Sequence, residues 1–259
     1  MFVAVLGVEI DESYDDLVLL RYILSFKQVA EAAEAVRKAI AWRAENKELL
    51  DKVARGEQLP CRAVIARYAV SDYHRKGLAD GSPLLVTRAA LCDLPALVAH
   101  VKMDELVAWL NYLNEQAYRE VDRVTRQTGR LTKVIRVNDL ANAPLLNQDR
   151  AFFSAIGKSS KMASFLYPQL VEANILLNSP SLISIVLKIA AQFVSPSTMS
   201  KVVLCQGRAT AKGNVADCPY ASRRFKMEDL PEFWGGKCDC DHTGCIQGAS
   251  NAAQTRADL

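Results

Sequence analysis

The sequence is poor in the residues and motifs that usually carry catalysis. It contains three histidines, His74, His100 and His242, and none stands in a setting typical of a catalytic triad. No Gly-x-Ser-x-Gly elbow, HExxH motif or paired-carboxylate signature occurs. Gly157-Lys158-Ser159 is similar to the end of a phosphate-binding loop, but Phe152 stands where that loop requires its first glycine. We therefore expect that the protein is not an enzyme and needs no cofactor.

The chain also lacks a large net charge and any long run of one charge. Its 259 residues carry a formal charge of +3, which is too small to indicate a nucleic-acid partner. Half of the residues are hydrophobic and 24% are charged, as in an ordinary soluble globular protein. A charge of +3 permits weak attraction to an anionic membrane surface without requiring it.

Two further features bear on the compartment. The N-terminal stretch MFVAVLGVEIDESYDD has no basic region and turns acidic at Glu9, so it is a poor signal peptide. The seven cysteines are an odd number and mostly scattered, which predicts a reduced intracellular set of thiols. We expect a cytoplasmic monomer that associates only transiently with membranes.

Four residues near the C-terminus form the one metal-like motif. Cys238, Cys240, His242 and Cys245 offer four zinc ligands within eight residues. Structural zinc sites usually use longer spacings to wrap a tetrahedron, so we expect no metal here and keep zinc as the alternative.

The stretch from Tyr167 to Cys205 organises the chain. A short apolar run at 172–178 predicts a buried strand, and Asn178-Ser179-Pro180 ends it. A helix is predicted at 182–194, where the polar residues Ser184, Lys188 and Gln192 form one thin stripe on an otherwise apolar cylinder. The run is too short to span a membrane. Two interpretations remain, a core helix surrounded by protein or a lid over an apolar ligand.

Several motifs together resemble the CRAL-TRIO lipid-binding family, over about Asp16 to Cys238. They are Leu19-Leu20-Arg21-Tyr22-Ile23, Trp42-Arg43, Asp139-Leu140, Tyr167-Pro168, Asn178-x-Pro180, Pro196-x-Thr198-x-x-Lys201 and Leu230-Pro231-Glu232-Phe233-Trp234-Gly235-Gly236. The resemblance implies an α/β fold in which a mixed, mostly parallel sheet floors a pocket and a helix gates it. It also implies a helical N-terminal segment at 1–60 and a lipid-binding domain at 61–245. The small, polar stretch at 246–259 is expected to be a disordered tail.

The hydrophobic pattern predicts the elements of this fold. Helices are expected at 16–24, 29–43, 103–127 and 152–166. Strands are expected at 84–87, 131–140, 172–178 and 199–205. The order after residue 60 is then β-α-β-α-β-α-β, which indicates a mixed sheet rather than a purely parallel one.

The function that the resemblance implies is reversible binding of one phospholipid and its exchange between membranes, with phosphatidylinositol or a related anionic lipid as the ligand. The positions that bind the headgroup in phosphatidylinositol-transfer members of the family correspond to Arg43, Thr198 and Lys201 here. Gln169 replaces a glutamate and Ala44 replaces a lysine. Gln169 can hydrogen-bond an inositol hydroxyl or Lys201 but cannot neutralise Lys201. The site is therefore more positive, which favours an anionic headgroup and weakens the inference of phosphatidylinositol itself.

Arg136 is the unusual residue of the predicted floor. It lies mid-strand and shares a face with Val134 and Asn138. The family's choline signature needs Ser and Thr where Val134 and Arg136 stand, and a tyrosine at Leu85; Tyr112 alone is kept. Exchange of phosphatidylcholine is therefore not expected. Arg136 binds either a phosphate or carboxylate in the pocket, or a protein acid such as Asp122 or Asp139.

The walls of a lipid pocket resemble an ordinary core in sequence. The residues expected to line the acyl pocket and gate are Leu85, Val134, Ile175, Leu177, Ile183 and Leu187. Two alternatives to a transfer protein stay open: a sensor or adaptor of the same fold that does not transfer its ligand, and an interaction domain with a solid core.

Overall fold

A five-stranded mixed sheet forms the centre of the protein in the computed structural model, which describes residues 13–74, 78–143, 149–194, 196–206, 215 and 218–238. The strands lie in sequence order, β1 (Ser71–His74), β2 (Leu84–Arg88), β3 (Val134–Asp139), β4 (Val171–Ser179) and β5 (Val202–Gln206). β1 pairs antiparallel with β2, and the remaining pairs are parallel. The predicted mixed, mostly parallel sheet is confirmed.

Helices connect the parallel strands, as parallel pairing requires. α6 (Leu94–His100) and α7 (Met103–Thr128) join β2 to β3, and α8 (Arg150–Leu166) joins β3 to β4. The short helices α9 (Ile183–Ala190) and α10 (Pro196–Met199) join β4 to β5. The other helices of the described residues are α2 (Asp16–Ile23), α3 (Val29–Glu45), α4 (Lys47–Arg55), α5 (Arg62–Tyr68) and α11 (Ala221–Arg224).

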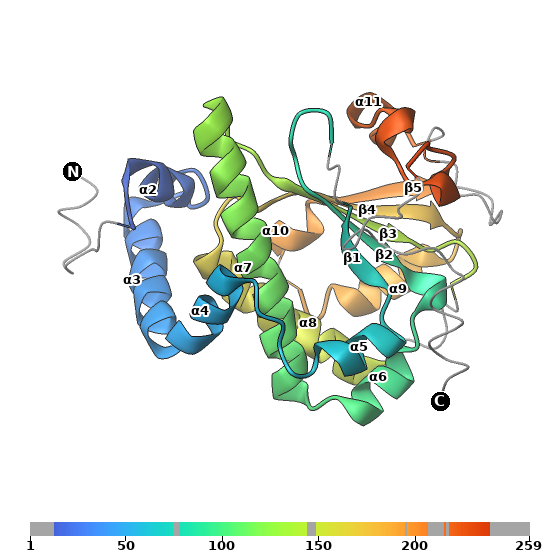
Figure 1. Ribbon diagram of the computed structural model, residues 1–259, viewed down its shortest axis with the longest axis horizontal. Coiled ribbons are helices and arrows are strands. Elements are labelled where there is room, and N and C mark those ends of the chain that lie inside the picture. Colours follow the sequence, from blue (N-terminus) through green and yellow to red (C-terminus); the bar gives the residue numbers. More distant parts are fainter. Residues whose placement is uncertain are drawn as a thin grey trace.

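The two faces of the sheet have different covers (Figure 1). One face, here called the outer face, packs against the C-terminal segment 218–238, whose Phe225, Leu230 and Trp234 join its apolar cluster. The buried strand residues of the outer face are Leu84, Val86, Ile135, Val137, Ile175 and Leu177. The opposite face, here called the inner face, is turned toward α7, α8, α9 and α10.

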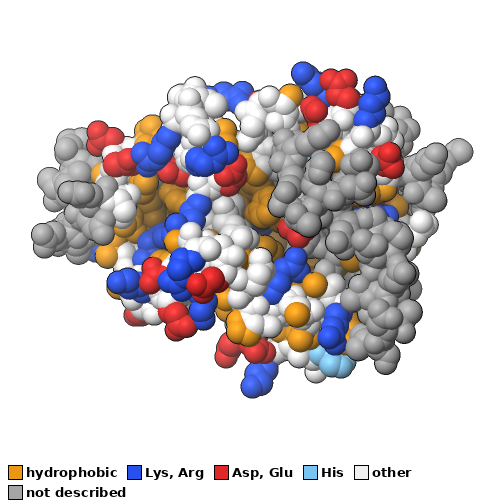
Figure 2. All heavy atoms as spheres, viewed as in Figure 1, with side chains coloured by type: hydrophobic (Ala, Val, Ile, Leu, Met, Phe, Trp, Pro, Cys, Tyr) orange, Lys and Arg blue, Asp and Glu red, His pale blue; other side chains and the backbone are white. Residues whose placement is uncertain are grey.

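The N-terminal helices pack on α7 and α8, so that α7 stands between them and the sheet (Figure 1). Tyr22 and Val36 share an apolar cluster with Tyr118 of α7, and the Tyr22 hydroxyl donates to the Phe165 carbonyl at 2.9 Å. Figure 2 shows hydrophobic side chains in the recess between these helices and α7, with charged side chains around it. α2 and α3, which fall in the segment predicted at 1–60, thus share an apolar core with α7 and α8.

Three details differ from the sequence-based expectations. The helix predicted at 182–194 ends at Ala190, and turns follow it. Met199 ends a helical turn that begins at Pro196, a residue suited to a first helical position, so β5 begins only at Val202. The expectation of fully reduced thiols is wrong for one pair, because a disulfide joins Cys205 of β5 to Cys218.

Two predictions concern residues that the structure does not describe. The tail at 246–259 lies outside the described residues, as do Cys240, His242 and Cys245 of the zinc motif. Within the described ranges, no group of three or more His, Cys, Asp and Glu residues is arranged to hold a metal ion. In the same ranges, no helix has the length and hydrophobicity needed to cross a membrane.

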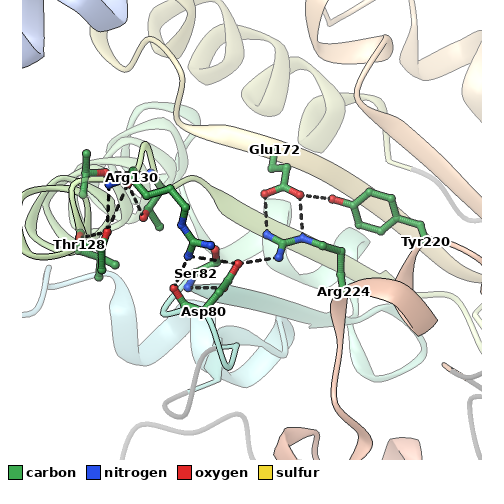
Figure 3. A network of polar contacts seen from close by, with 10 residues as sticks. Asp80, Ser82, Thr128, Arg130, Glu172, Tyr220 and Arg224 are labelled. Carbon is green, nitrogen blue, oxygen red and sulfur yellow. Dashed lines mark hydrogen bonds and ion pairs between the residues drawn. The ribbon is translucent and has the colours of Figure 1, made fainter.

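Arg224 ties the C-terminal segment to the sheet (Figure 3). Its guanidinium contacts Glu172 of β4 at 2.9 Å and Asp80, in the loop before β2, at 2.6 Å. Burial alone would raise the pKa of Asp80, but hydrogen bonds from Arg224 and Ser82 outweigh burial and lower it to about 2. The same guanidinium, with Tyr220, also lowers the pKa of Glu172 against the effect of burial.

We expect the substitution Arg224→Met to lower the free energy of unfolding by about 1–2 kcal/mol at pH 7, a value reduced for the partial exposure of these groups. Because both carboxyl pKa values are depressed in the folded state, this contribution is present above about pH 4.5 and fades as the pH falls toward 2. Urea unfolding at pH 7 and pH 3 measures the difference. Arg223→Met, one residue away with no ion pair to a described residue, is the control. An equal loss at both pH values would contradict the assignment.

Candidate functional site

α9 is an apolar helix with one exposed side and one side turned toward the protein. Leu182, Ile185 and Ile189 are 60%, 55% and 38% exposed and follow one another along one side of the helix. On the other side Ile183 is buried and Leu187 is half-buried. None of the α9 residues that the structure describes belongs to one of the three large apolar clusters. The interpretation of this segment as a core helix is therefore wrong, because a core helix is surrounded by protein and α9 has one side exposed to solvent.

The side chains on the inner face of the sheet are more exposed to solvent than those on the outer face. On β4, Asn174 and Leu176 are half-buried, whereas the alternate residues Ala173, Ile175 and Leu177 are fully buried. The same contrast holds on the strands beside it. The accessible inner-face residues there are Arg136 and Asn138 of β3 and Val202 and Leu204 of β5, with Leu204 43% exposed. Solvent-accessible space therefore remains along the inner face of β3, β4 and β5.

The predicted acyl-pocket residues divide between the two faces. Leu85 and Val134 lie on the inner face and pack with Tyr118 of α7. Ile175 and Leu177 lie on the outer face, in the cluster that contains Trp234. Of the predicted strand residues, only Leu85 and Val134 therefore lie on the inner face. The predicted α9 residues Ile183 and Leu187 lie on the protein-facing side of that helix.

Thr198 and Lys201 lie together where the chain passes from α10 to β5. The Thr198 hydroxyl is 3.2 Å from the Ser160 hydroxyl of α8, and the Lys201 carbonyl accepts from the backbone N–H of Asn174 at 2.9 Å. Lys201 is half-buried and makes no ion pair with any residue in the described ranges. Burial lowers the pKa of Lys201, and the charges of Lys133 and Arg136 lower it further.

Arg136 points from β3 toward α7, and its Nη2 donates to Asn114 Oδ1 at 2.5 Å. The predicted alternatives of a salt bridge to Asp122 or Asp139 are wrong. Asp122 pairs with Arg126 at 2.6 Å, and Asp139 accepts from Trp234 Nε1 at 2.8 Å. Among the described residues no carboxylate forms an ion pair with Arg136.

Three other predicted headgroup residues are engaged elsewhere. Arg43 Nη2 lies 2.9 Å from Oε2 of the buried Glu115 of α7, and its guanidinium lies over the Tyr167 ring. Gln169 Nε2 donates to the Leu24 carbonyl and to the Ser25 hydroxyl, each at 3.0 Å, beside the end of α2. These two residues thus hold the N-terminal helices in place.

Tyr112 of α7 is the third. Its hydroxyl donates to the Glu57 carbonyl at 2.8 Å, and its ring is buried in the apolar cluster formed with α5 and α6. Arg43, Gln169 and Tyr112 thus each bond to other groups of the protein.

Sequence reasoning missed the polar residues behind Arg136. Asn111, Asn114 and Ser159 are all buried, and they link α7 to α8 and β3 through hydrogen bonds. The available signal was the pair of asparagines three residues apart on a long amphipathic helix, because buried amides need partners.

Gly157 of α8 lies against the turn that follows α9. A Cβ on Gly157 would lie 2.6 Å from the Phe193 carbonyl oxygen, so only glycine permits this approach. The Phe193 ring also stacks on Phe153, with 6.2 Å between ring centroids. A groove of about 450 Å³ lies beside the contact, lined by Ser154, Gly157, Lys158, Lys161, Ser164, Gln192, Phe193 and Val194. The contact fixes the C-terminal end of α9 on α8.

The family model of the CRAL/TRIO domain matches residues 79–236 of the chain, which contain all of the strands except β1. The protein therefore belongs to the CRAL/TRIO domain family, a family of lipid-binding and transfer proteins.

Individual relatives agree with this assignment at low identity. Patellin-6 of Arabidopsis thaliana is 25% identical over 225 residues, which are 85% of this chain and 51% of that protein. The Sec14 cytosolic factor of Schizosaccharomyces pombe is 22% identical over 235 residues, 88% of this chain and 77% of that protein. The crystal structure of Sfh5 is similar in fold, with a TM-score of 0.55 and 16% identity over 93% of this chain and 78% of that chain. The chain thus spans about half the length of patellin-6.

The Arg43–Glu115 pair generates a stability prediction. We expect Arg43→Met to lower the free energy of unfolding by about 2–4 kcal/mol, because Glu115 stays buried with Arg119 as its one remaining cation. The double variant Arg43→Met/Glu115→Gln should recover part of that loss in a urea-unfolding cycle. If Arg43 instead acts mainly on a headgroup, Arg43→Met will unfold like the wild type and bind lipid more weakly.

The Gly157 contact generates a second prediction. Gly157→Ala should force the turn at Phe193 away from α8 and loosen the end of α9. Hydrogen–deuterium exchange measured by mass spectrometry should then be faster at 183–194 and unchanged in α7. Ser154→Ala, on the same groove, should leave exchange at 183–194 as in the wild type. Unaltered exchange there in Gly157→Ala would exclude a role for this contact in holding α9.

Proposed function

We propose that the protein binds one phospholipid between the inner face of the sheet and α9, and exchanges it between membranes. The observation that carries this proposal is the contrast between the two faces of the sheet. One face is sealed by the chain's own C-terminal segment, and the other remains accessible beneath a helix that is apolar on both sides. Membership in the CRAL/TRIO family supports the same conclusion.

α9 acts as the gate in this proposal. With the gate closed, Ile183 and Leu187 contact the acyl chains, while Leu182, Ile185 and Ile189 face water. On a membrane the water-facing residues enter the acyl region, and their burial offsets the cost of moving α9 off the sheet. The hinges are the breaks at Pro180 and Pro196, and the Gly157–Phe193 contact holds the closed position.

Thr198 and Lys201 bind the headgroup phosphate in this proposal. Lys201 has no carboxylate partner among the described residues, and the charges of Lys133 and Arg136 repel its ammonium group. A bound anion would relieve this repulsion. An anionic phospholipid, with phosphatidylinositol as the first to test, fits this requirement. Two relatives are named phosphatidylinositol transfer protein SFH5; that of Chaetomium globosum is 27% identical over 142 residues.

The protein acts without catalysis in this proposal, as a cytoplasmic monomer that visits membranes transiently. The relative from Schizosaccharomyces pombe bears the name cytosolic factor, and it supports this location. The gating step requires one membrane-facing helix and no second subunit.

Transfer between liposomes tests the proposal. The wild type should carry fluorescent phosphatidylinositol from donor to acceptor vesicles, and Ile185→Asp should slow transfer about tenfold or more, because a charge on the outward side of α9 opposes membrane entry. Native mass spectrometry should still detect one lipid bound to Ile185→Asp after long incubation with vesicles.

Leu20→Asp is the matched control, because Leu20 of α2 is 46% exposed and Ile185 is 55% exposed. It should transfer lipid at the wild-type rate. Absence of any bound lipid in wild-type protein incubated with vesicles would overturn the proposed function, and equal slowing in both variants would overturn the role of α9.

A further inference from the structure

A chain of buried polar side chains ends at Arg136 on the inner face. Asn111 Nδ2 contacts the Met162 sulfur at 3.4 Å, and Asn111 Oδ1 accepts from the Ser159 hydroxyl at 2.8 Å. The Ser159 oxygen in turn accepts from Asn114 Nδ2 at 3.2 Å, which leaves Asn114 Oδ1 facing Arg136 Nη2 at 2.5 Å. Each contact fixes the orientation of the next amide, so α7 and α8 hold the guanidinium in one position.

Every partner in this chain is neutral. No described carboxylate pairs with Arg136, and its Nε is buried without a hydrogen-bond partner. A partly buried cation held only by amides costs free energy unless a counter-charge is supplied. Burial lowers the pKa of Arg136, and the nearby Tyr73 phenol partly offsets this. Tyr73 supplies no charge itself, because burial raises its pKa to about 12 and its hydroxyl donates to the Leu113 carbonyl.

The surroundings of Arg136 are positive and accessible. Arg136 pairs with Asn174 across β3 and β4, and Asn174 pairs with Val202, the residue after Lys201. Arg136 and Lys133 both repel Lys201. Arg136 and Asn174 are half-buried on the open face, so a ligand above the sheet can reach them.

We propose that Arg136 directly binds the anionic group of the ligand, a phosphate or a carboxylate, so that the pocket selects acidic lipids. This inference rests on the proposed function, since it assigns the ligand class of the same pocket. The half-buried guanidinium offers a charged donor without a carboxylate partner among the described residues, beside Asn174 and near Lys201. A choline headgroup is disfavoured there, because its cation would lie among Lys133, Arg136 and Lys201.

Phosphatidic acid and diacylglycerol with identical acyl chains make the direct test, because they differ only in the phosphate. The full chain is incubated with phosphatidylcholine vesicles that contain both lipids in equal amounts, re-isolated, and analysed by native mass spectrometry. The wild type should retain phosphatidic acid over diacylglycerol by about ten- to a hundredfold, the range expected for charge-assisted hydrogen bonds. Arg136→Met should bring that ratio close to one while total bound lipid is preserved, and Arg136→Lys should keep part of the preference.

Arg88→Met is the matched control. Arg88 lies on the adjacent strand β2, half-buried, with its guanidinium over the Phe233 ring of the C-terminal segment at 4.3 Å. It should retain the wild-type lipid ratio. Separate incubations with oleate-containing vesicles and with inorganic phosphate distinguish a carboxylate, a lipid phosphate and a free phosphate as the bound anion.

The outcomes separate the two proposals. Wild-type protein that retains no lipid of any class overturns the proposed function. Wild-type protein that retains lipid, with the same ratio in Arg136→Met, overturns the role of Arg136 alone. Equal loss of both lipids in Arg136→Met, accompanied by a lower melting temperature, also overturns it by assigning Arg136 a purely structural role.

Discussion

The hydrogen bond from Trp234 Nε1 to Asp139 Oδ2, at 2.8 Å, joins the C-terminal segment to the end of β3, and the open inner face depends on this closure of the outer one. The second oxygen of Asp139 accepts from Asn178 at the end of β4, so one buried carboxylate ties two strands and the segment together. The outer face is thereby covered, while Asn174 and Leu176 on the inner face of β4 stay half-buried.

α9 is only lightly attached to the rest of the protein. It contributes no described residue to the large apolar clusters, and it presents aliphatic side chains such as Ile185 to water. Elements with few buried contacts open at low free-energy cost, and that property is the one a gate requires. Gly157 allows the turn at Phe193, just after α9, to approach α8 closely. The helix is thus lightly packed along its length and held at its C-terminal end by this contact.

Much of the fold was predictable from periodicity and turn chemistry, whereas the site depended on contacts that local sequence does not contain. The long helix at Met103–Thr128 and the strand at Val171–Ser179 were predicted within three residues at each end. β1 was missed because SDYH has little apolar alternation. The inner and outer faces of β4 were not distinguished, since both Leu176 and Leu177 are apolar and only the tertiary cover separates them. The role of Arg43 could not be read either, because Glu115 lies 72 residues away.

Arg43 and Arg136 are both buried in part, and their hydrogen-bonding partners determine whether the charge is neutralised within the protein. Burial lowers the pKa of each, but the Glu115 carboxylate more than reverses the effect for Arg43, whose pKa is raised overall. Arg136 meets only amides, so its pKa stays depressed and its charge stays uncompensated by the described chain. An anion that binds the folded state alone would remove this cost and stabilise the fold by mass action. If Arg136 binds the ligand as proposed, ligand binding and stability are coupled through a single side chain, and exchange of lipid at a membrane would replace one anionic group with another without leaving Arg136 unpaired.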